Sequence, residues 1–177
     1  MRVIVHVRFT CAADYNERRL PYRPAHLAQL NDLRTAGHVV AGGPEPDGSA
    51  AHIFYRVADE AELERLLDDN VFQKAGLFSA RHPRVFREFL EPLAPPPLDA
   101  GLKVTLVEGT PLDHGLAGVR LAELQRQKRA AFGGFFADGA GLAVLTTPSA
   151  GEAIAWLTAA GGWDAVGVRS RAWSQTL

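Results

Sequence analysis

A proline-rich segment near the middle of the chain constrains the fold more than any other feature: Glu91-Pro92-Leu93-Ala94-Pro95-Pro96-Pro97. Three consecutive prolines favour an extended, semi-rigid spacer. On each side of this spacer the hydrophobic pattern gives the same order of elements: strand, helix, strand, strand, helix, strand. The sequence therefore predicts two related modules, over residues 1–91 and 102–177, joined by a proline-rich linker over residues 92–101.

Composition limits what the two modules can do. The chain has 177 residues, of which 47% are hydrophobic, so it is long and apolar enough to bury a core. Its formal net charge of −1 gives no basic field to attract nucleic acid. The sequence also contains no run of about 20 apolar residues, the length that a membrane-spanning helix needs. One cysteine excludes an internal disulfide, and the six histidines have no metal-ligand spacing. We expect a cytoplasmic protein that binds no metal, nucleic acid or membrane.

The first module begins with a strand in which Val3, Val5, Val7 and Phe9 alternate with other residues at period two. Three residues mark boundaries of the helices that follow. Pro24 fits the first turn of a helix, Gly37 fits the position after its end, and Asp59 fits the start of the next helix. In order, these signals predict a helix over residues 24–36, strands over 38–42 and 51–57 around the turn Pro46-Asp47-Gly48, a helix after Asp59, a loop over 68–76 and a strand over 77–86.

The second module follows the same order with low residue identity, so the prediction of a repeat rests on the order of elements. Ser149 is a good N-cap for its second helix. The pattern predicts a strand over residues 103–108, a helix over 116–132, a hairpin of strands over 135–137 and 142–146, a helix after residue 149 and a strand over 164–174.

Each module has the order of a ferredoxin-like βαββαβ fold, in which both helices cover one face of a four-stranded sheet. The other face must also be covered, and the sheet of the other module is the nearest cover. We therefore predict an α+β fold in which tandem ferredoxin-like repeats form an intramolecular pseudo-dimeric α+β barrel. Such a chain would be a monomer with an internal pseudo-twofold axis, or it would associate further as a homodimer.

The uncovered sheet face of the first module mixes polar and aromatic side chains. These side chains occupy alternate positions of two predicted strands and so point to the same face of the sheet: His6, Arg8, His52, Phe54 and Arg56. These residues could flank a cavity, and we predict that His6, Arg8 and His52 contact a substrate. The alternative is a polar layer between the two sheets of the barrel.

Three segments of the first module carry a resemblance to a known family: Arg23-Pro24-Ala25-His26-Leu27, Gly37-His38-Val39-Val40-Ala41-Gly42-Gly43-Pro44 and Phe72-Gln73-Lys74-Ala75-Gly76. On these residues the first half resembles the YCII-related family of the dimeric α+β barrel superfamily, over roughly residues 1 to 90. The superfamily includes isomerases, dehydrochlorinases and monooxygenases, so the resemblance implies proton-transfer chemistry more than hydrolysis.

The resemblance also implies an active pair, a histidine on the first helix and the aspartate of an Asp-Pro-Phe motif whose phenylalanine corresponds to Phe72. The histidine corresponds to His26. The family's Asp-Pro corresponds to Asn70 and Val71 here, so the carboxylate is missing, although Asp69 lies one position earlier. Asparagine can orient an imidazole by a hydrogen bond, but it cannot stabilise an imidazolium as a carboxylate does. We predict His26, Asn70 and Asp69 as catalytic residues.

The position of His26 supports a role as a base independently of the resemblance. The dipole at a helix start disfavours a positive charge, so a neutral imidazole is available as a proton acceptor. Arg23 lies one turn earlier and could bind a carboxylate or phenolate of the substrate. The alternative is that His26 is a half-buried helix residue bonded to a loop carbonyl and Arg23 is solvated.

Two functions follow from these residues. The first is a small-molecule enzyme without a cofactor that transfers a proton on a small cyclic or aromatic metabolite, with its functional cavity in the first module. The second is a non-catalytic ligand-binding or assembly module in which the altered aspartate position marks lost chemistry. A carboxylate within hydrogen-bonding reach of His26 would favour the enzyme, and an outward or salt-bridged Asp69 would favour the binding module.

Overall fold

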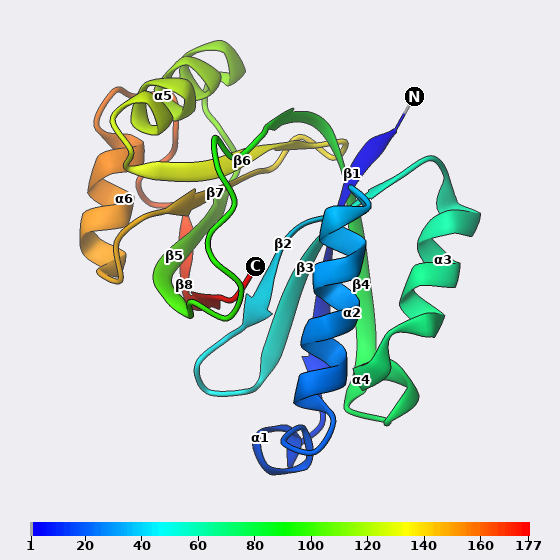
Figure 1. Ribbon diagram of the computed structural model, residues 1–177. Helices are drawn as coiled ribbons and strands as arrows, with labels where there is room; N and C mark the ends of the chain where they lie inside the picture. The colour runs from blue at the N-terminus through cyan, green and yellow to red at the C-terminus, as the bar shows by residue number, and fades with distance from the viewer. Residues whose placement is uncertain (1) are drawn as a thin grey trace. The chain divides into compact units, whose positions relative to one another are not determined.

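The computed structural model describes residues 2–177 as an α+β fold with eight antiparallel strands (Figure 1). The chain divides into two compact units. Unit 1 holds the residues up to Val85 together with Pro95–Gly101 and Gln175–Leu177, and unit 2 holds Phe86–Ala94 and Leu102–Ser174. No helix within residues 2–177 is long and apolar enough to cross a membrane.

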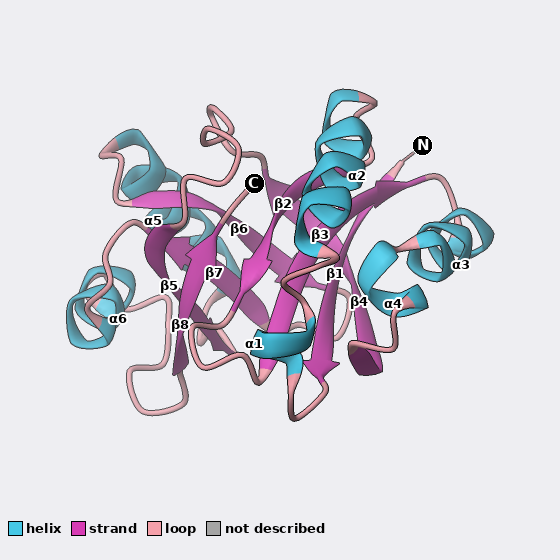
Figure 2. Cartoon of the chain, turned by 60° about the horizontal axis from the view of Figure 1, so that its bottom comes forward, coloured by secondary structure: helices cyan, strands magenta, loops and turns pink. Residues whose placement is uncertain are grey.

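The sheet of unit 1 has the strand order β2-β3-β1-β4. Strand β1 is central, because Val7 pairs with Ile53 on one side and with Pro83 on the other. Helices α2, α3 and α4 lie on one side of these strands (Figure 1, Figure 2). The elements are β1 (Val3–Cys11), α1 (Tyr15–Arg18), α2 (Arg23–Thr35), β2 (Val39–Pro44), β3 (Ala50–Val57), α3 (Glu60–Asp69), α4 (Val71–Lys74) and β4 (Phe78–Leu90).

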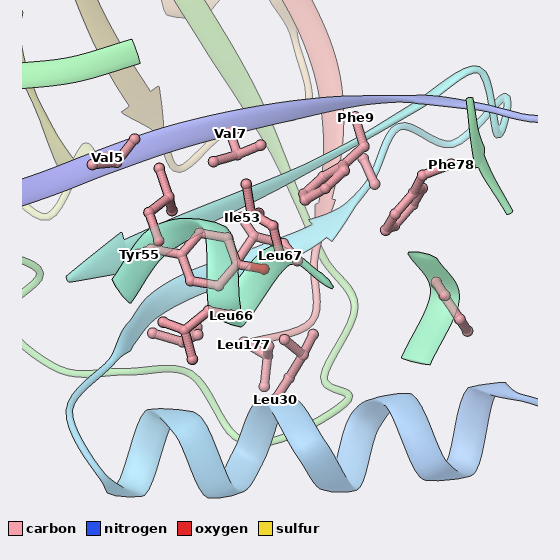
Figure 3. Close-up of a cluster of buried hydrophobic side chains, with 14 of the residues drawn as sticks. Val5, Val7, Phe9, Leu30, Ile53, Tyr55, Leu66, Leu67, Phe78 and Leu177 are labelled. Atoms are coloured by element: carbon pink, nitrogen blue, oxygen red, sulfur yellow. The ribbon is translucent and has the colours of Figure 1, made fainter. Parts of the chain in front are cut away.

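The alternation predicted for the first strand is confirmed. Its valines and Phe9 pack into the core on the helix side, with Ile53 and Tyr55 of β3 and Leu30 of α2. Leu177, which follows the last strand of the chain, is fully buried in the same core and points toward Leu30 (Figure 3). The side chains at the alternate positions of β1 and β3 therefore point to the other face of the sheet. They include His6, Arg8 and His52.

The turn between β2 and β3 is also the predicted one. Gly48 donates its backbone N–H to the carbonyl of Glu45 at 3.0 Å. Its φ of +76° is a left-handed conformation that glycine adopts without strain. This closed turn fixes the position of Glu45 at the end of β2.

In unit 2 the strands have the order β6-β7-β5-β8, and the Phe86–Leu90 part of β4 pairs with β6. Asp113 and Ser149 cap the two helices by accepting backbone N–H groups of Leu116 and Glu152. The elements are β5 (Leu102–Gly109), α5 (His114–Arg126), β6 (Ala130–Phe136), β7 (Gly141–Leu145), α6 (Ala150–Thr158) and β8 (Arg169–Gln175).

Several element boundaries differ from the prediction: β4 continues to Leu90 rather than residue 86, β8 begins at Arg169 rather than residue 164, and the short helix α1 was not predicted. Helix α5 ends at Arg126 rather than near residue 132, because the chain turns at Lys128, with φ +60°, and residues 130–136 form β6. The predicted loop over residues 68–76 contains the one-turn helix α4. The order of elements in each half is otherwise the predicted one, while the facing of the two sheets and the relation of the halves as a repeat stay predictions.

Candidate functional site

His26 lies in the first turn of α2, where Pro24 fits because the first helical N–H groups have no partner within the helix. Its side chain is buried, with 7% of the residue exposed. The imidazole ring stacks on Phe72 of α4, with centroids 3.7 Å apart and planes 13° from parallel. Its Nδ1 atom is buried and has no hydrogen-bond partner among residues 2–177. One edge of this histidine thus has a polar atom that the described protein does not satisfy.

Burial sets the protonation of this imidazole. It lowers the pKa of His26 to about 3, and the neighbouring Arg23 guanidinium adds to the effect. The ring is therefore neutral at neutral pH. One ring nitrogen carries a proton and the other carries a lone pair that can accept one.

Arg23 forms an ion pair with Asp99 of the linker over residues 92–101. Asp99 has φ +60°, and its backbone N–H donates to the carbonyl of Thr176 at 2.8 Å. Arg34, further along α2, donates to the carbonyl of Pro96 at 3.0 Å. These contacts hold the segment Pro95–Gly101 against α2. The guanidinium of Arg23 is therefore already paired with a carboxylate of the chain itself.

The two other predicted catalytic residues have structural contacts. The Asn70 side chain is almost fully buried, and its Oδ1 accepts the N–H groups of Phe72 at 2.9 Å and Gln73 at 3.3 Å, which makes it the N-cap of α4. Asp69 points outward and forms ion pairs with Lys74 at 3.0 Å and Arg65 at 3.9 Å. Within residues 2–177 neither side chain is hydrogen-bonded to His26.

Gln29 is a residue of this region that sequence reasoning missed. Its Nε2 donates to the carbonyl of Asp69 at 2.8 Å, and its Oε1 accepts the N–H of Val71 at 3.0 Å. The side chain thus clamps the junction of α3 and α4 onto α2 and holds Phe72 against His26. Its spacing of three residues from His26 places it on the same helix face, which was the available signal.

The predicted substrate-binding residues of the sheet form a second group, around a glutamate that the sequence analysis did not select. Nε2 of His6 lies 2.9 Å from Nδ1 of His52, and Nε2 of His52 lies 2.9 Å from Oε1 of Glu45. The guanidinium of Arg8 is 3.6 Å from the same oxygen. Glu45 lies directly before the turn Pro46-Asp47-Gly48, which leads into β3. That position was the sequence signal from which this glutamate could have been selected.

The structure therefore divides the predicted residues between two places. His26, Asn70 and Phe72 lie on the helix side of the unit 1 sheet, whereas His6 and His52 lie on its opposite face. They do not form one site.

Unit 2 contains cavities of its own. One, of about 270 Å³, is polar and includes two arginines; it is lined by Glu108, Gly109, Thr110, Ala140, Gly167, Arg169 and Arg171. A second, of about 190 Å³, is lined by residues of β4, α5 and β6, among them Phe89, Leu121 and Phe135. These cavities carry no assigned role, and the functional cavity expected in the first module stays a prediction.

The fold of this chain is similar to that of two solved structures over nearly the whole length of each chain. It matches a protein from Lactobacillus acidophilus NCFM proposed to be a monooxygenase, over 99% of this chain and 94% of that one, with 10% identity and a TM-score of 0.59. It also matches a heme-binding protein from Thermus thermophilus, over 99% and 92% of the two chains, with 10% identity and a TM-score of 0.56. At this identity the likeness shows the fold alone.

The family of the first half is the predicted one. Residues 1–87 match the family model of the YCII-related domain, so this part of the chain is a YCII-related domain. A further match, over 45% of this chain and 89% of the other, is the 5-chloro-2-hydroxyhydroquinone dehydrochlorinase TftG from Burkholderia phenoliruptrix AC1100 in complex with 2,5-dihydroxybenzoquinone, with 21% identity and a TM-score of 0.41. No curated protein matches the chain.

Proposed function

We propose that this chain is a small-molecule enzyme that transfers a proton on a small cyclic or aromatic metabolite without a cofactor, and that the metabolite contacts His26. The YCII-related domain supports the class of protein, and the surroundings of His26 support the place. Arg23 would hold an anionic group of the same ligand.

The observation that carries this proposal is the buried Nδ1 of His26, which has no hydrogen-bond partner within residues 2–177. Leaving a buried polar atom unsatisfied costs about 1–3 kcal/mol, so such an atom needs a reason to persist. A bound ligand that supplies the missing partner is such a reason. Phe72 covers one face of the ring, so the ligand would meet the imidazole at its edge or open face.

The neutral ring of His26 has a lone pair that can accept a proton, and its lowered pKa makes it a weak base until a ligand offsets the positive charge that forms. A proton would leave a C–H or O–H group of the ligand for the lone pair of the ring, and it would then return to another atom of the same ligand. The lowered pKa means that the imidazolium is a short-lived species. A carboxylate or phenolate of the ligand on Arg23, in place of Asp99, would offset the positive charge that forms next to it.

A second function, a ligand-binding module without catalysis, is favoured by one specific observation. Asp69 is outward and paired with Lys74, and Asn70 caps α4, so no carboxylate is hydrogen-bonded to His26 within the described chain. An outward, salt-bridged Asp69 was the feature expected of a binding module, so this arrangement favours a module that binds its ligand without catalysis. The two functions share the ligand site and differ in whether a proton moves.

Two measurements separate them. Benzoate and salicylate, as anionic aromatic probes, would be titrated against the wild type, His26→Gln and Arg23→Gln with histidine NMR as the readout. Exchange of the α-hydrogens of cyclohexanone for deuterium in D2O would report proton transfer. His114→Gln is the matched control, because His114 begins the corresponding helix α5 of unit 2 and is exposed.

For an enzyme, His26→Gln would lower the exchange rate by about 10²-fold, the lower end of the range for a lost general base, and His114→Gln would leave it unchanged. Binding that is lost in His26→Gln without any exchange in the wild type would instead establish the binding module. Binding that is indifferent to His26 would contradict both.

A further inference from the structure

The larger cavity of unit 2, of about 270 Å³, has two arginine side chains in its wall. Arg169 and Arg171 are two residues apart on β8, so their side chains point to the same face of that strand and their Cα atoms are about 6.6 Å apart. Strand β8 lies beside β5 in the sheet (Figure 1), and the end of β5 also lines the cavity. The fold thus holds two positive charges side by side at one cavity.

Arg169 is the arginine that can take an external partner. It is exposed, and its guanidinium forms no ion pair or hydrogen bond within residues 2–177. Arg171 and Glu108, which line the same cavity, each have an interaction within the chain. Because the wall has two arginines and one glutamate, its charged side chains carry a net positive charge. An anion is therefore attracted to this cavity.

The rest of the wall has no bulky side chain, since the other lining residues are Gly109, Thr110, Ala140 and Gly167. Packing requires the first glycine, because a Cβ atom at Gly109 would lie 2.8 Å from Cγ1 of Val168. The loop before β8 can therefore approach the end of β5. Thr110 is exposed, and its hydroxyl has no hydrogen-bond partner within the described chain. The wall thus has a second donor in addition to the arginines.

One carboxylate lies near the cavity without lining it. Asp164 is in the loop before β8, and its Oδ1 accepts the backbone N–H of Val166 at 3.0 Å. Its Oδ2 would be 2.7 Å from a Cβ atom at Gly167, which does line the cavity. This negative charge limits how much anionic charge the cavity can hold.

We propose that this cavity binds the carboxylate of a small organic molecule, held by the guanidinium of Arg169 and the hydroxyl of Thr110. A guanidinium presents two parallel N–H groups to the two oxygens of a carboxylate. One negative charge matches the net positive charge of the wall, and Asp164 disfavours a more highly charged ligand. The volume of about 270 Å³ lies below the roughly 300–1,000 Å³ of common ligand pockets, so the molecule has few atoms beyond its carboxylate.

This site belongs to a different part of the chain from the one proposed at His26. All of its lining residues are in unit 2, whereas His26 and Arg23 are in unit 1. The carboxylate site therefore does not rest on the proposed function, and it would bind its ligand whether or not His26 moves a proton.

The test is a titration of the full-length protein with glycolate, a small hydroxycarboxylate, and separately with inorganic phosphate. Proton–nitrogen NMR follows the backbone amides of Thr110 and Gly167 and the side-chain Nε–H of Arg169, at constant ionic strength. We expect saturable shifts with glycolate and a dissociation constant on the order of a few millimolar, because few charge-assisted hydrogen bonds hold it. An absence of saturable shifts with glycolate, or tighter binding of phosphate, would overturn the proposal.

Three variants test the two donors. Arg169→Gln should weaken glycolate binding by about tenfold or more, since it removes hydrogen bonds from a charged group. Arg169→Lys keeps the charge but not the two parallel N–H groups, so its affinity should fall between those of Arg169→Gln and the wild type. Thr110→Val should weaken binding by about threefold, the effect of one neutral hydrogen bond. Arg169→Lys that binds glycolate as tightly as the wild type would contradict recognition by the guanidinium.

Arg126→Gln is the matched control, because Arg126 is another exposed arginine of unit 2, at the end of α5 and outside the cavity. It removes the same charge, so the affinity for glycolate should stay within about twofold of the wild type in screening salt. Equal weakening in Arg126→Gln and Arg169→Gln would show a nonspecific effect of charge and would overturn the proposed site.

Discussion

At the scale of single residues, two buried histidines of one domain have different neighbours. His26 is buried against Phe72, no carboxylate among residues 2–177 is hydrogen-bonded to it, and burial lowers its pKa to about 3. His6 is buried to a similar degree, but it reaches Glu45 through His52. Burial thus weakens His26 as a base, because it disfavours the protonated imidazole.

The first prediction restores a carboxylate beside α4. Asn70→Asp should raise the pKa of His26, because a negative charge near a buried imidazole stabilises its protonated form. The replacement keeps an oxygen that can cap α4, so the fold should be retained. Histidine NMR titrations of both proteins provide the measurement. If another histidine responds more than His26, residues 26 and 70 do not interact and the binding module becomes the better account.

A second prediction concerns the carboxylate that now occupies Arg23. Asp99→Asn removes that negative charge and leaves the arginine for an external anion. Benzoate should then bind more tightly, by about 1.4-fold to fivefold, since the exposed ion pair contributes on the order of 0.2–1 kcal/mol and is screened by solvent. Asp113→Asn, which alters an exposed cap in unit 2, is the control. Equal affinities in Asp99→Asn and the wild type would show that Arg23 does not bind the ligand.

At the scale of helices and strands, local signals predicted much of the structure. Asp59 and Ser149 cap the helices that they were predicted to begin, because their side-chain oxygens satisfy the first backbone N–H groups. The end of α5 was wrong, because the charged residues up to Arg129 continue a helical pattern and only the burial of Phe132 in β6 shows where the strand begins. Tertiary packing decided that boundary.

A third prediction follows from the close pairing of β4 and β6. A Cβ atom at Gly134 would lie 2.1 Å from the carbonyl oxygen of Glu88, so Gly134→Ala must displace one of the two strands. We expect a loss of about 1–3 kcal/mol in the free energy of unfolding, measured in urea. Gly151→Ala is the matched control, because that position in α6 has open space around it and alanine favours helices. Equal effects of the two substitutions would contradict the described strand pairing.

At the scale of the whole molecule, the sequence predicted the order of elements and the family of the first half, whereas it left the grouping of the site residues open. His6 and His52 were selected by strand parity, but Glu45 joins them only because the turn before β3 brings it across the sheet. Asn70 was selected by its alignment with the family's aspartate, yet its contacts make it a helix cap. Contacts across strands and helix junctions depend on register, which the pattern of one sequence does not fix.

The fourth prediction links His26 to the stability of the protein. In the unfolded chain His26 is protonated below about pH 6.5, whereas in the folded chain it stays neutral down to about pH 3. The unfolded state thus binds more protons in this window, and the free energy of unfolding falls as the pH falls. Between pH 7 and pH 4 this histidine should account for a loss of roughly 3 kcal/mol. Urea unfolding of the wild type and His26→Gln at both pH values measures it, and parallel losses in the two proteins would contradict the prediction.

The account depends most directly on the unsatisfied edge of His26, and nitrogen-15 NMR of that imidazole in the presence of benzoate and salicylate tests it. We predict that His26 stays neutral from pH 4 to pH 8 without a ligand and that its Nδ1 resonance shifts when a probe binds, while the resonances of His114 do not move. A His26 that titrates near pH 6.5, or an Nδ1 resonance that stays unchanged when the probe binds elsewhere, would contradict the proposed site.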